Sequence, residues 1–163
     1  MGVFFCRHQT AEWDFPLQSR LKRRVGLNLG WEIGGVIDKV LGDGVDLLFC
    51  NEQEAKLLAD TDHLDDAIES LKQYARTFAI TLGGEGAVAF DGETLHKIAP
   101  NPVKAVDTNG AGDMFAGAFL YAITHGHDFA AAGRLASAAS AQVVSQFGPR
   151  LEAEQHEPLK AAL

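Results

Sequence analysis

The residues best suited to do chemistry lie in a short glycine-rich stretch, 107–120, which reads DTNGAGDMFAGAFL. We predict that a strand ends near Val106 and that a helix follows at once. Three small residues would then stand at the helix N-terminus: Gly110, Ala111 and Gly112. Free N–H groups and the helix dipole favour an anion there, and small side chains let a phosphate approach the amides. Asp113, in the first turn, could accept the proton of a hydroxyl that attacks phosphorus.

An isolated Gly-Ala-Gly-Asp also has a simpler interpretation, in which the glycines let the chain turn and Asp113 only complements the helix dipole. The two best-known phosphate loops do not match. A Rossmann fingerprint starting at Gly110 needs Gly or Ala where Phe115 stands, and a Walker loop needs a Gly-Lys pair, which the sequence lacks. A Rossmann dehydrogenase is therefore disfavoured.

A second pair of polar residues, Asn51 and Glu54, stands at a predicted strand-to-helix junction in CNEQEA. Their spacing is that of a capping box, in which each side chain accepts a hydrogen bond from the backbone of the other residue. A helix start that faces a ligand crevice would also bring Glu54 near a metal ion. Both interpretations stay open at this point.

The elements that must position these residues alternate along the chain. We predict strands at 46–50, 77–82, 87–91, 94–98 and 103–106, and helices at 32–41, 51–60, 64–75, 112–125 and 128–145, with a last short helix after the loop QFGPR. Alternation of strands and helices favours an α/β sheet with some antiparallel strands. Residues 1–31 show no clear periodicity and are interpreted as a poorly determined leader or an altered start.

Composition excludes several classes of protein. With 14 basic and 22 acidic residues the net charge is −8, which disfavours a broad electrostatic grip on nucleic acid or on an anionic membrane. The two cysteines, Cys6 and Cys50, form no metal or redox motif, and the start lacks the features of a signal peptide. We expect a soluble, cytoplasmic protein.

The string DTNGAGDMFAGAFL resembles the second signature of the ribokinase/PfkB family of sugar and nucleoside kinases, and its Asn109 is similar to the adenosine-kinase-like variant. The resemblance implies a truncated ribokinase-like three-layer α/β sandwich, with helices flanking a mostly parallel sheet that has some antiparallel strands. It also implies an ATP-dependent phosphotransferase. In that reading, residues 110–113 form the anion hole over the γ-phosphate, and Asp113 is the base that deprotonates a hydroxymethyl group.

The resemblance assigns further residues and ligands. Its nucleotide contacts are Thr81, Gly83, Gly86 and Asn109. Its metal-linked residues are Asn51, Glu54 and Asp107. The first two would organise Mg²⁺, and Asp107 with Gly148 would border a monovalent-cation site for an ion such as K⁺. The implied partners are a sugar or nucleoside and, where sheet edges are uncovered, a second copy of the chain.

The resemblance covers about residues 40–150, so residues 32–163 are interpreted as the C-terminal nucleotide-binding and catalytic part of such a kinase. The family's first signature, its lid and most of its sugar contacts have no counterpart before Glu32. Positioning supplies most of the catalysis in phosphoryl transfer. The alternative is therefore a truncated, non-catalytic nucleotide-binding or interaction fragment.

Overall fold

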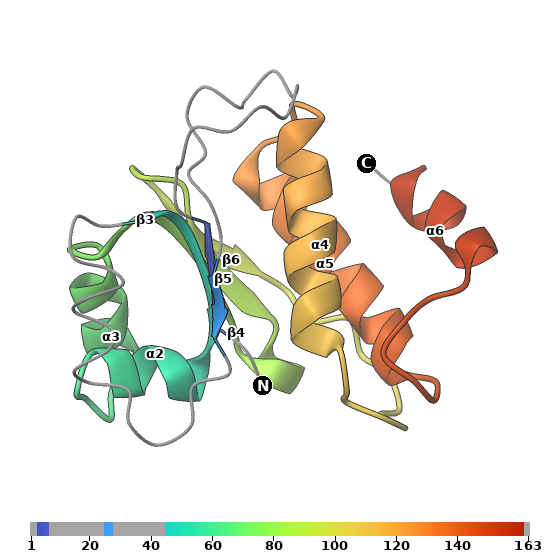
Figure 1. Cartoon of the computed structure of the whole chain (residues 1–163), viewed down its shortest axis with the longest axis horizontal. Coiled ribbons are helices and arrows are strands. Elements are labelled where there is room, and N and C mark those ends of the chain that lie inside the picture. The colour runs from blue at the N-terminus through green and yellow to red at the C-terminus, as the bar shows by residue number, and fades with distance from the viewer. Residues whose placement is uncertain (1–2, 7–24, 28–44, 162–163) are drawn as a thin grey trace. The chain divides into compact units, whose positions relative to one another are not determined.

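The computed structural model describes residues 3–6, 25–27 and 45–161 (Figure 1). The chain divides into two compact units. Unit 1 comprises Met1–Thr81 and Phe90–Thr94, and unit 2 comprises Leu82–Ala89 and Leu95–Leu163. The helix predicted at 32–41 lies outside the described residues. The division of the chain at residue 31 stays a prediction.

Unit 1 contains a mixed sheet of strand order β2-β1-β3-β4. Its strands are β1 (Val3–Cys6), β2 (Val25–Leu27), β3 (Val45–Asn51) and β4 (Ala75–Thr81). Strand β1 is antiparallel to both β2 and β3, whereas β3 and β4 are parallel, with Leu48 opposite Phe78. Two strands therefore come from the range 1–31, in which the sequence predicted none.

Strands β3 and β4 form the core of unit 1. The consecutive residues Leu47 and Leu48 of β3 are both fully buried, so both faces of this strand are covered. This explains why its sequence is an unbroken apolar run instead of an alternating one. Phe78 and Ile80 of β4 are equally buried. The predictions of strands at 46–50 and 77–82 are confirmed.

Two short helices complete unit 1: α2 (Glu52–Leu58) and α3 (Leu64–Leu71). Helix α3 buries Ala67, Ile68 and Leu71, a spacing that places all three on one helix face. The prediction of a helix running to residue 75 is wrong at its end. Ala75 already pairs with Val45 in the sheet, and this strand pairing overrides helix propensity.

The strands predicted at 87–91 and 94–98 are confirmed as β5 (Ala87–Phe90) and β6 (Leu95–Ile98), which are neighbours in the sheet. The Asp91 Oδ1 atom closes the connecting turn by accepting hydrogen bonds from the amides of Glu93 and Thr94 at 2.9 and 2.7 Å. A short 3₁₀ turn, η1 (Gly83–Glu85), precedes β5.

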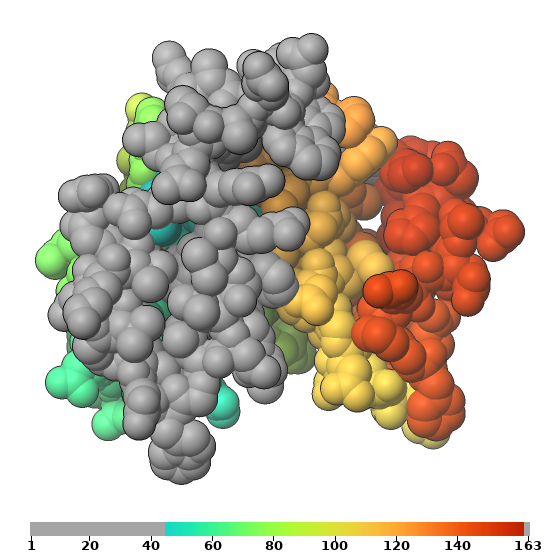
Figure 2. All heavy atoms as spheres, in the orientation of Figure 1, coloured from blue at the N-terminus to red at the C-terminus, as the bar shows by residue number. Residues whose placement is uncertain are grey.

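Three helices dominate unit 2: α4 (Ala111–Thr124), α5 (Phe129–Val144) and α6 (Ala153–Lys160). Small residues let α5 pack closely, and a Cβ on its Gly133 would lie 2.4 Å from Cγ1 of Ile98 in β6. Helix α6 has no buried residue, and its atoms lie at the margin of unit 2 in the space-filling view (Figure 2, red). Among the described helices, none is both long and apolar enough to cross a bilayer.

The strand predicted at 103–106 is wrong. This segment has no regular secondary structure, and the side chains of Val103 and Val106 are 47% and 44% exposed. Its backbone is held instead by the end of α5, where Val106 N donates to Val144 O at 2.7 Å. The alternating sequence suits a strand, but the amides of Val106 and Asp107 both donate to Val144 O, so the end of α5 takes donors that a neighbouring strand would need. The glycine-rich stretch therefore follows an exposed loop.

Candidate functional site

Helix α4 is preceded by a glycine, Gly110, at a position where the backbone and the packing allow no other residue without strain. Gly110 is the N-cap residue and has φ 77°, a left-handed conformation that other residues adopt only with strain. A Cβ at this position would lie 2.6 Å from both the Cβ and the carbonyl oxygen of Pro149. The loop after α5 therefore packs directly against the start of α4.

Two amides at this helix start have no acceptor among the described residues. We call residues 110–113 the anion turn. Ala111 N donates to Thr108 O at 3.4 Å, and Met114 N donates to Gly110 O at 2.8 Å. The two amides between these, those of Gly112 and Asp113, have no such partner among the described residues. A Cβ on Gly112 would meet nothing within 4 Å, and the Asp113 side chain is exposed. The turn thus offers donors and one carboxylate to an incoming anion.

Asp107 ties the loop after α5 to the anion turn. Its Oδ1 atom accepts a hydrogen bond from Asn109 N at 3.0 Å, and its Oδ2 atom accepts one from Gly148 N at 3.1 Å. These bonds, that of Asn109 first, lower the pKa of the Asp107 carboxyl because they stabilise its ionised form. The sequence predicted a joint cation site for Asp107 and Gly148. The structure brings the two residues into direct contact, and each carboxylate oxygen keeps a lone pair for another ligand.

Helix α5 contacts both sides of this region through serine hydroxyls. Ser140 Oγ donates to the carbonyl oxygen of Ala111, in the anion turn, at 2.9 Å. Ser137, which is buried, donates to Ala99 O at 3.2 Å and accepts from Asn101 Nδ2 at 3.0 Å. The anion turn and the loop around Asn101 are therefore fixed to the same helix.

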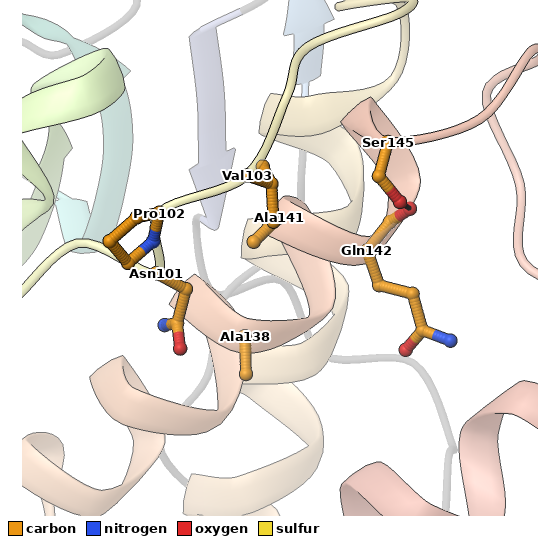
Figure 3. A pocket seen from close by; sticks show the side chains of 7 residues that line it. All are labelled: Asn101, Pro102, Val103, Ala138, Ala141, Gln142 and Ser145. Carbon is orange, nitrogen blue, oxygen red and sulfur yellow. Dashed lines mark hydrogen bonds between the residues drawn. The ribbon is translucent and has the colours of Figure 1, made fainter.

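Unit 2 also has a surface hollow of about 320 Å³, which we call the α5 hollow (Figure 3). One side is formed by the loop and the other by α5, and the lining residues are Asn101, Pro102, Val103, Ala138, Ala141, Gln142 and Ser145. Its volume is at the lower end of the range for small-molecule sites. The hollow was not predicted from the sequence, because its loop side was interpreted as a strand.

The capping box predicted for Asn51 and Glu54 is present at the start of α2. Glu54 N donates to Asn51 Oδ1 at 2.8 Å, and Asn51 N donates to Glu54 Oε2 at 2.9 Å. Burial, and secondarily the Glu54 carboxylate, raise the pKa of the neighbouring Cys50 thiol, which stays neutral. Within the described ranges, no three His, Cys, Asp or Glu side chains gather as a metal cluster.

The turn at residues 82–86, which we call the glycine turn, carries two of the predicted nucleotide contacts, Gly83 and Gly86, and they differ in their surroundings. A Cβ on Gly86 would lie 2.2 Å from Ile98 O, so packing alone explains this glycine. Gly83 has φ 59° and is exposed, with nothing within 4 Å of its Cβ position. Thr81 is the last residue of β4 and belongs to unit 1. The capping-box residues Asn51 and Glu54, at the β3–α2 junction, belong to unit 1 as well. The other predicted site residues belong to unit 2.

Comparison with known proteins gives the relationships of the chain. The model of the pfkB family carbohydrate kinases matches residues 31–156. The chain belongs to this family. The ribokinase of Lactococcus lactis subsp. lactis (strain IL1403) is 42% identical over 106 residues, which are 65% of this chain and 34% of that protein. The family resemblance predicted from the sequence is confirmed.

Solved structures confirm the ribokinase-like α/β fold class. A probable sugar kinase protein from Rhizobium etli CFN 42 has a TM-score of 0.73 and 34% identity, covering 79% of this chain and 39% of that one. The adenosine kinase from Sinorhizobium meliloti has a TM-score of 0.73 and 30% identity, covering 80% and 40%. The chain therefore spans well under half the length of these relatives.

Proposed function

We propose that this pfkB-family chain binds ATP with Mg²⁺ and supplies the anion-binding backbone and the base for phosphoryl transfer to a hydroxymethyl group of a sugar or nucleoside. The observation that carries the proposal is the anion turn. The uncapped amides of Gly112 and Asp113 lie beside an exposed carboxylate, in the stretch that matches the family signature. When bound, ATP supplies the phosphoryl group, and Mg²⁺ neutralises charge on the phosphate oxygens.

In this proposal the anion turn stabilises the charge that develops on the transferred group. Donors fixed at a helix N-terminus need no reorganisation during the reaction, which makes such stabilisation effective. Asp113 accepts the proton of the attacking hydroxyl. Its exposure leaves the carboxylate accessible to a substrate, and its place in the first turn of α4 holds it next to the amides.

The residues proposed for the metal fit Mg²⁺. This ion keeps several waters and is usually bound through one or two carboxylates together with substrate phosphates, so it does not need a preformed cluster of protein ligands. The Glu54 carboxylate uses Oε2 in the capping box, which leaves Oε1 to hold a metal-bound water. Asp107, with Gly148, is proposed for a monovalent cation.

We assign the nucleotide base to the α5 hollow and the glycine turn. The hollow combines apolar walls from Val103 and Ala141 with the amide side chains of Asn101 and Gln142 (Figure 3). This mixture is typical of a nucleobase site, since aliphatic groups cover the ring and amides reach its polar edge. Thr81, Gly83, Gly86 and Asn109 stay proposed nucleotide contacts.

The substrate is proposed only as a class. One relative is named a ribokinase and another an adenosine kinase, and both names describe substrates with a ribose ring. A second copy of the chain is proposed as a partner wherever a sheet edge is uncovered.

A calorimetric titration with Mg-ATP tests the proposal. We expect saturable binding by the unaltered chain and loss of binding in Gly112→Asp, because the new carboxylate occupies the open side of the anion turn and repels phosphate. Gly117→Asp is the matched control. It introduces the same charge on the same helix, at an exposed position with nothing within 4 Å of its Cβ, and should retain binding. Equal binding by all three proteins would refute the anion turn as the phosphate site.

The alternative function is nucleotide binding without transfer, which the open amides of the anion turn would also serve. A panel of sugars and nucleosides with Mg-ATP distinguishes the two. ADP formed above background, and absent without acceptor, supports the kinase. Saturable binding with no ADP from any acceptor supports the non-catalytic alternative.

A further inference from the structure

We infer that Ser140 is a positioning residue that aims the Gly112 amide at the phosphate, and that Ser137 holds the nucleobase side of the same site. The inference rests on the proposed function and extends it to α5, which contributes neither the base nor the phosphate-binding amides. Two hydroxyls three residues apart, on one face of the helix, would then hold the phosphate side and the nucleobase side of the site in place independently of each other.

The argument for Ser140 follows from the geometry of one peptide unit. The Ala111 carbonyl and the Gly112 N–H belong to the same planar trans peptide, so they point in opposite directions within one plane. The Ser140 hydroxyl donates to that carbonyl oxygen at 2.9 Å. Fixing the oxygen therefore also fixes the direction of the Gly112 N–H, which has no acceptor of its own among the described residues.

The Ser140 hydrogen bond also favours anion binding by strengthening the Gly112 N–H as a donor. A hydrogen bond accepted by a carbonyl polarises its amide and strengthens the N–H as a donor. The first turn of a helix otherwise frays readily, because its amides lack partners within the helix. A hydroxyl from the neighbouring helix thus orders the turn before any anion arrives and reduces the ordering cost of binding.

Ser137 makes the corresponding connection to the α5 hollow. Its hydroxyl accepts from the Asn101 side chain and donates to Ala99 O, which fixes the loop on which Asn101 lines the hollow. The Ser137 side chain lies outside the hollow lining and is itself buried. Its effect on a base therefore passes through Asn101, just as the effect of Ser140 on a phosphate passes through the Ala111–Gly112 peptide.

The two serines make opposite predictions for two probes, tripolyphosphate with Mg²⁺ and adenosine. We expect Ser140→Ala to weaken tripolyphosphate binding about fivefold, the value of one ordinary hydrogen bond, and to leave adenosine binding unchanged. Ser137→Ala should weaken adenosine binding by a similar factor and leave tripolyphosphate binding unchanged. Ser140→Thr, which keeps the hydroxyl, should restore tripolyphosphate binding. Equal effects of both alanine variants on both probes would overturn the inference.

A control separates positioning from a general loss of stability. Thr124 Oγ1 donates to Leu120 O at 2.8 Å near the other end of α4, so Thr124→Ala removes a similar bond far from the anion turn. It should change neither affinity. Alanine is a better helix former than serine, so the serine variants are expected to fold.

Amide hydrogen exchange of the ligand-free chain tests Ser140 without relying on nucleotide binding. Ser140→Ala should raise exchange at Met114, whose N–H closes the turn by donating to Gly110 O at 2.8 Å, by about fivefold relative to the unaltered chain, and Thr124→Ala should not. If neither probe binds but exchange responds in this way, the proposed function fails while the positioning of the turn by Ser140 stands. Unchanged exchange at Met114 would overturn the role of Ser140 whatever the binding data show.

Discussion

Both α2 and α4 begin with backbone amides that have no acceptor within the helix, and the two helix starts differ in whether side chains accept from these amides. At α2, the side chains of Asn51 and Glu54 each accept a backbone hydrogen bond, so the helix start is closed on itself. At α4, the N-cap residue is Gly110, which has no side chain, and the amides of Gly112 and Asp113 have no acceptor in the described part of the chain. The first arrangement stabilises the helix, whereas the second leaves donors for a ligand.

The start of α4 is therefore less stabilised by local hydrogen bonds than the start of α2. With Gly110 in place of a side-chain cap such as Asn51, α4 forgoes a few tenths of a kcal/mol, roughly the difference between glycine and asparagine at an N-cap. The start of α4 is held instead by distant contacts: Pro149 against Gly110, the Asp107 bond to Gly148, and the Ser140 bond to Ala111. None of these contacts uses the amides of Gly112 and Asp113, which stay open. An open helix start held by remote contacts is the arrangement expected of a preorganised anion site.

The largest effect is expected from Asp113→Asn. If Asp113 is the base, phosphoryl transfer should fall by about 10²- to 10⁴-fold with little change in Mg-ATP affinity. Asp66→Asn is the matched control, since Asp66 is also exposed and also occupies the third position of its helix, α3. The measurement is ADP release with the best acceptor of the panel. Turnover retained by the Asp113 variant would leave this residue with only a dipole role.

Gly110→Ala should destabilise unit 2 by at least about 2 kcal/mol. The left-handed φ costs a non-glycine residue about 1–2 kcal/mol, and the new Cβ would overlap the backbone of Pro149. In α4, Gly117→Ala makes the contrast, because there a helix-interior glycine is exposed and unhindered, and alanine should stabilise by up to about 1 kcal/mol. Urea unfolding monitored by circular dichroism measures both. A similar stability change in the two variants would contradict the close packing of Pro149.

Elements whose sequence carries its own signal could be predicted. The buried apolar runs of β3 and β4, the Asp91 turn and the amphipathic face of α3 all depend on local patterns, and all are present. The capping box of Asn51 and Glu54 could also be predicted, because the spacing of the two residues specifies it. The start of α4 could be placed to within one residue from its run of small residues, although the strand expected before it is absent.

Features that depend on distant contacts could not be predicted. The segment 103–106 alternates like a strand, but whether it pairs is decided by neighbouring strands, which local sequence does not reveal. Strands β1 and β2 are short and depend in the same way on their neighbours. The positive φ of Gly110 was a reasonable expectation, whereas its contact with Pro149, 39 positions later, was not. The α5 hollow combines two segments equally far apart.

Glu54→Gln separates the two interpretations of the α2 start. Glutamine also serves in a capping box, so unfolding free energy should change by less than about 0.5 kcal/mol, whereas Asn51→Ala should cost about 1 kcal/mol. If Glu54 also organises the metal, its variant should need several times more Mg²⁺ for half-maximal ADP release, because the charge is gone. An unchanged Mg²⁺ requirement would reduce Glu54 to a capping residue.

The smallest effect is expected at Asp107, and it depends on pH. Because the folded-state pKa of Asp107 is lowered, its bonds to Asn109 and Gly148 add stability that is fully present above the unfolded pKa of about 3.9 and is lost as pH falls through the lower folded value. Asp107→Asn, whose amide group cannot accept from both backbone N–H groups, should therefore be less stable than the unaltered chain at pH 6. The difference should shrink below about pH 4. Denaturant unfolding between pH 3 and 7, with Asp66→Asn to correct for the loss of one charge, measures this. A difference independent of pH would mean that the carboxylate charge does not hold the loop to the anion turn.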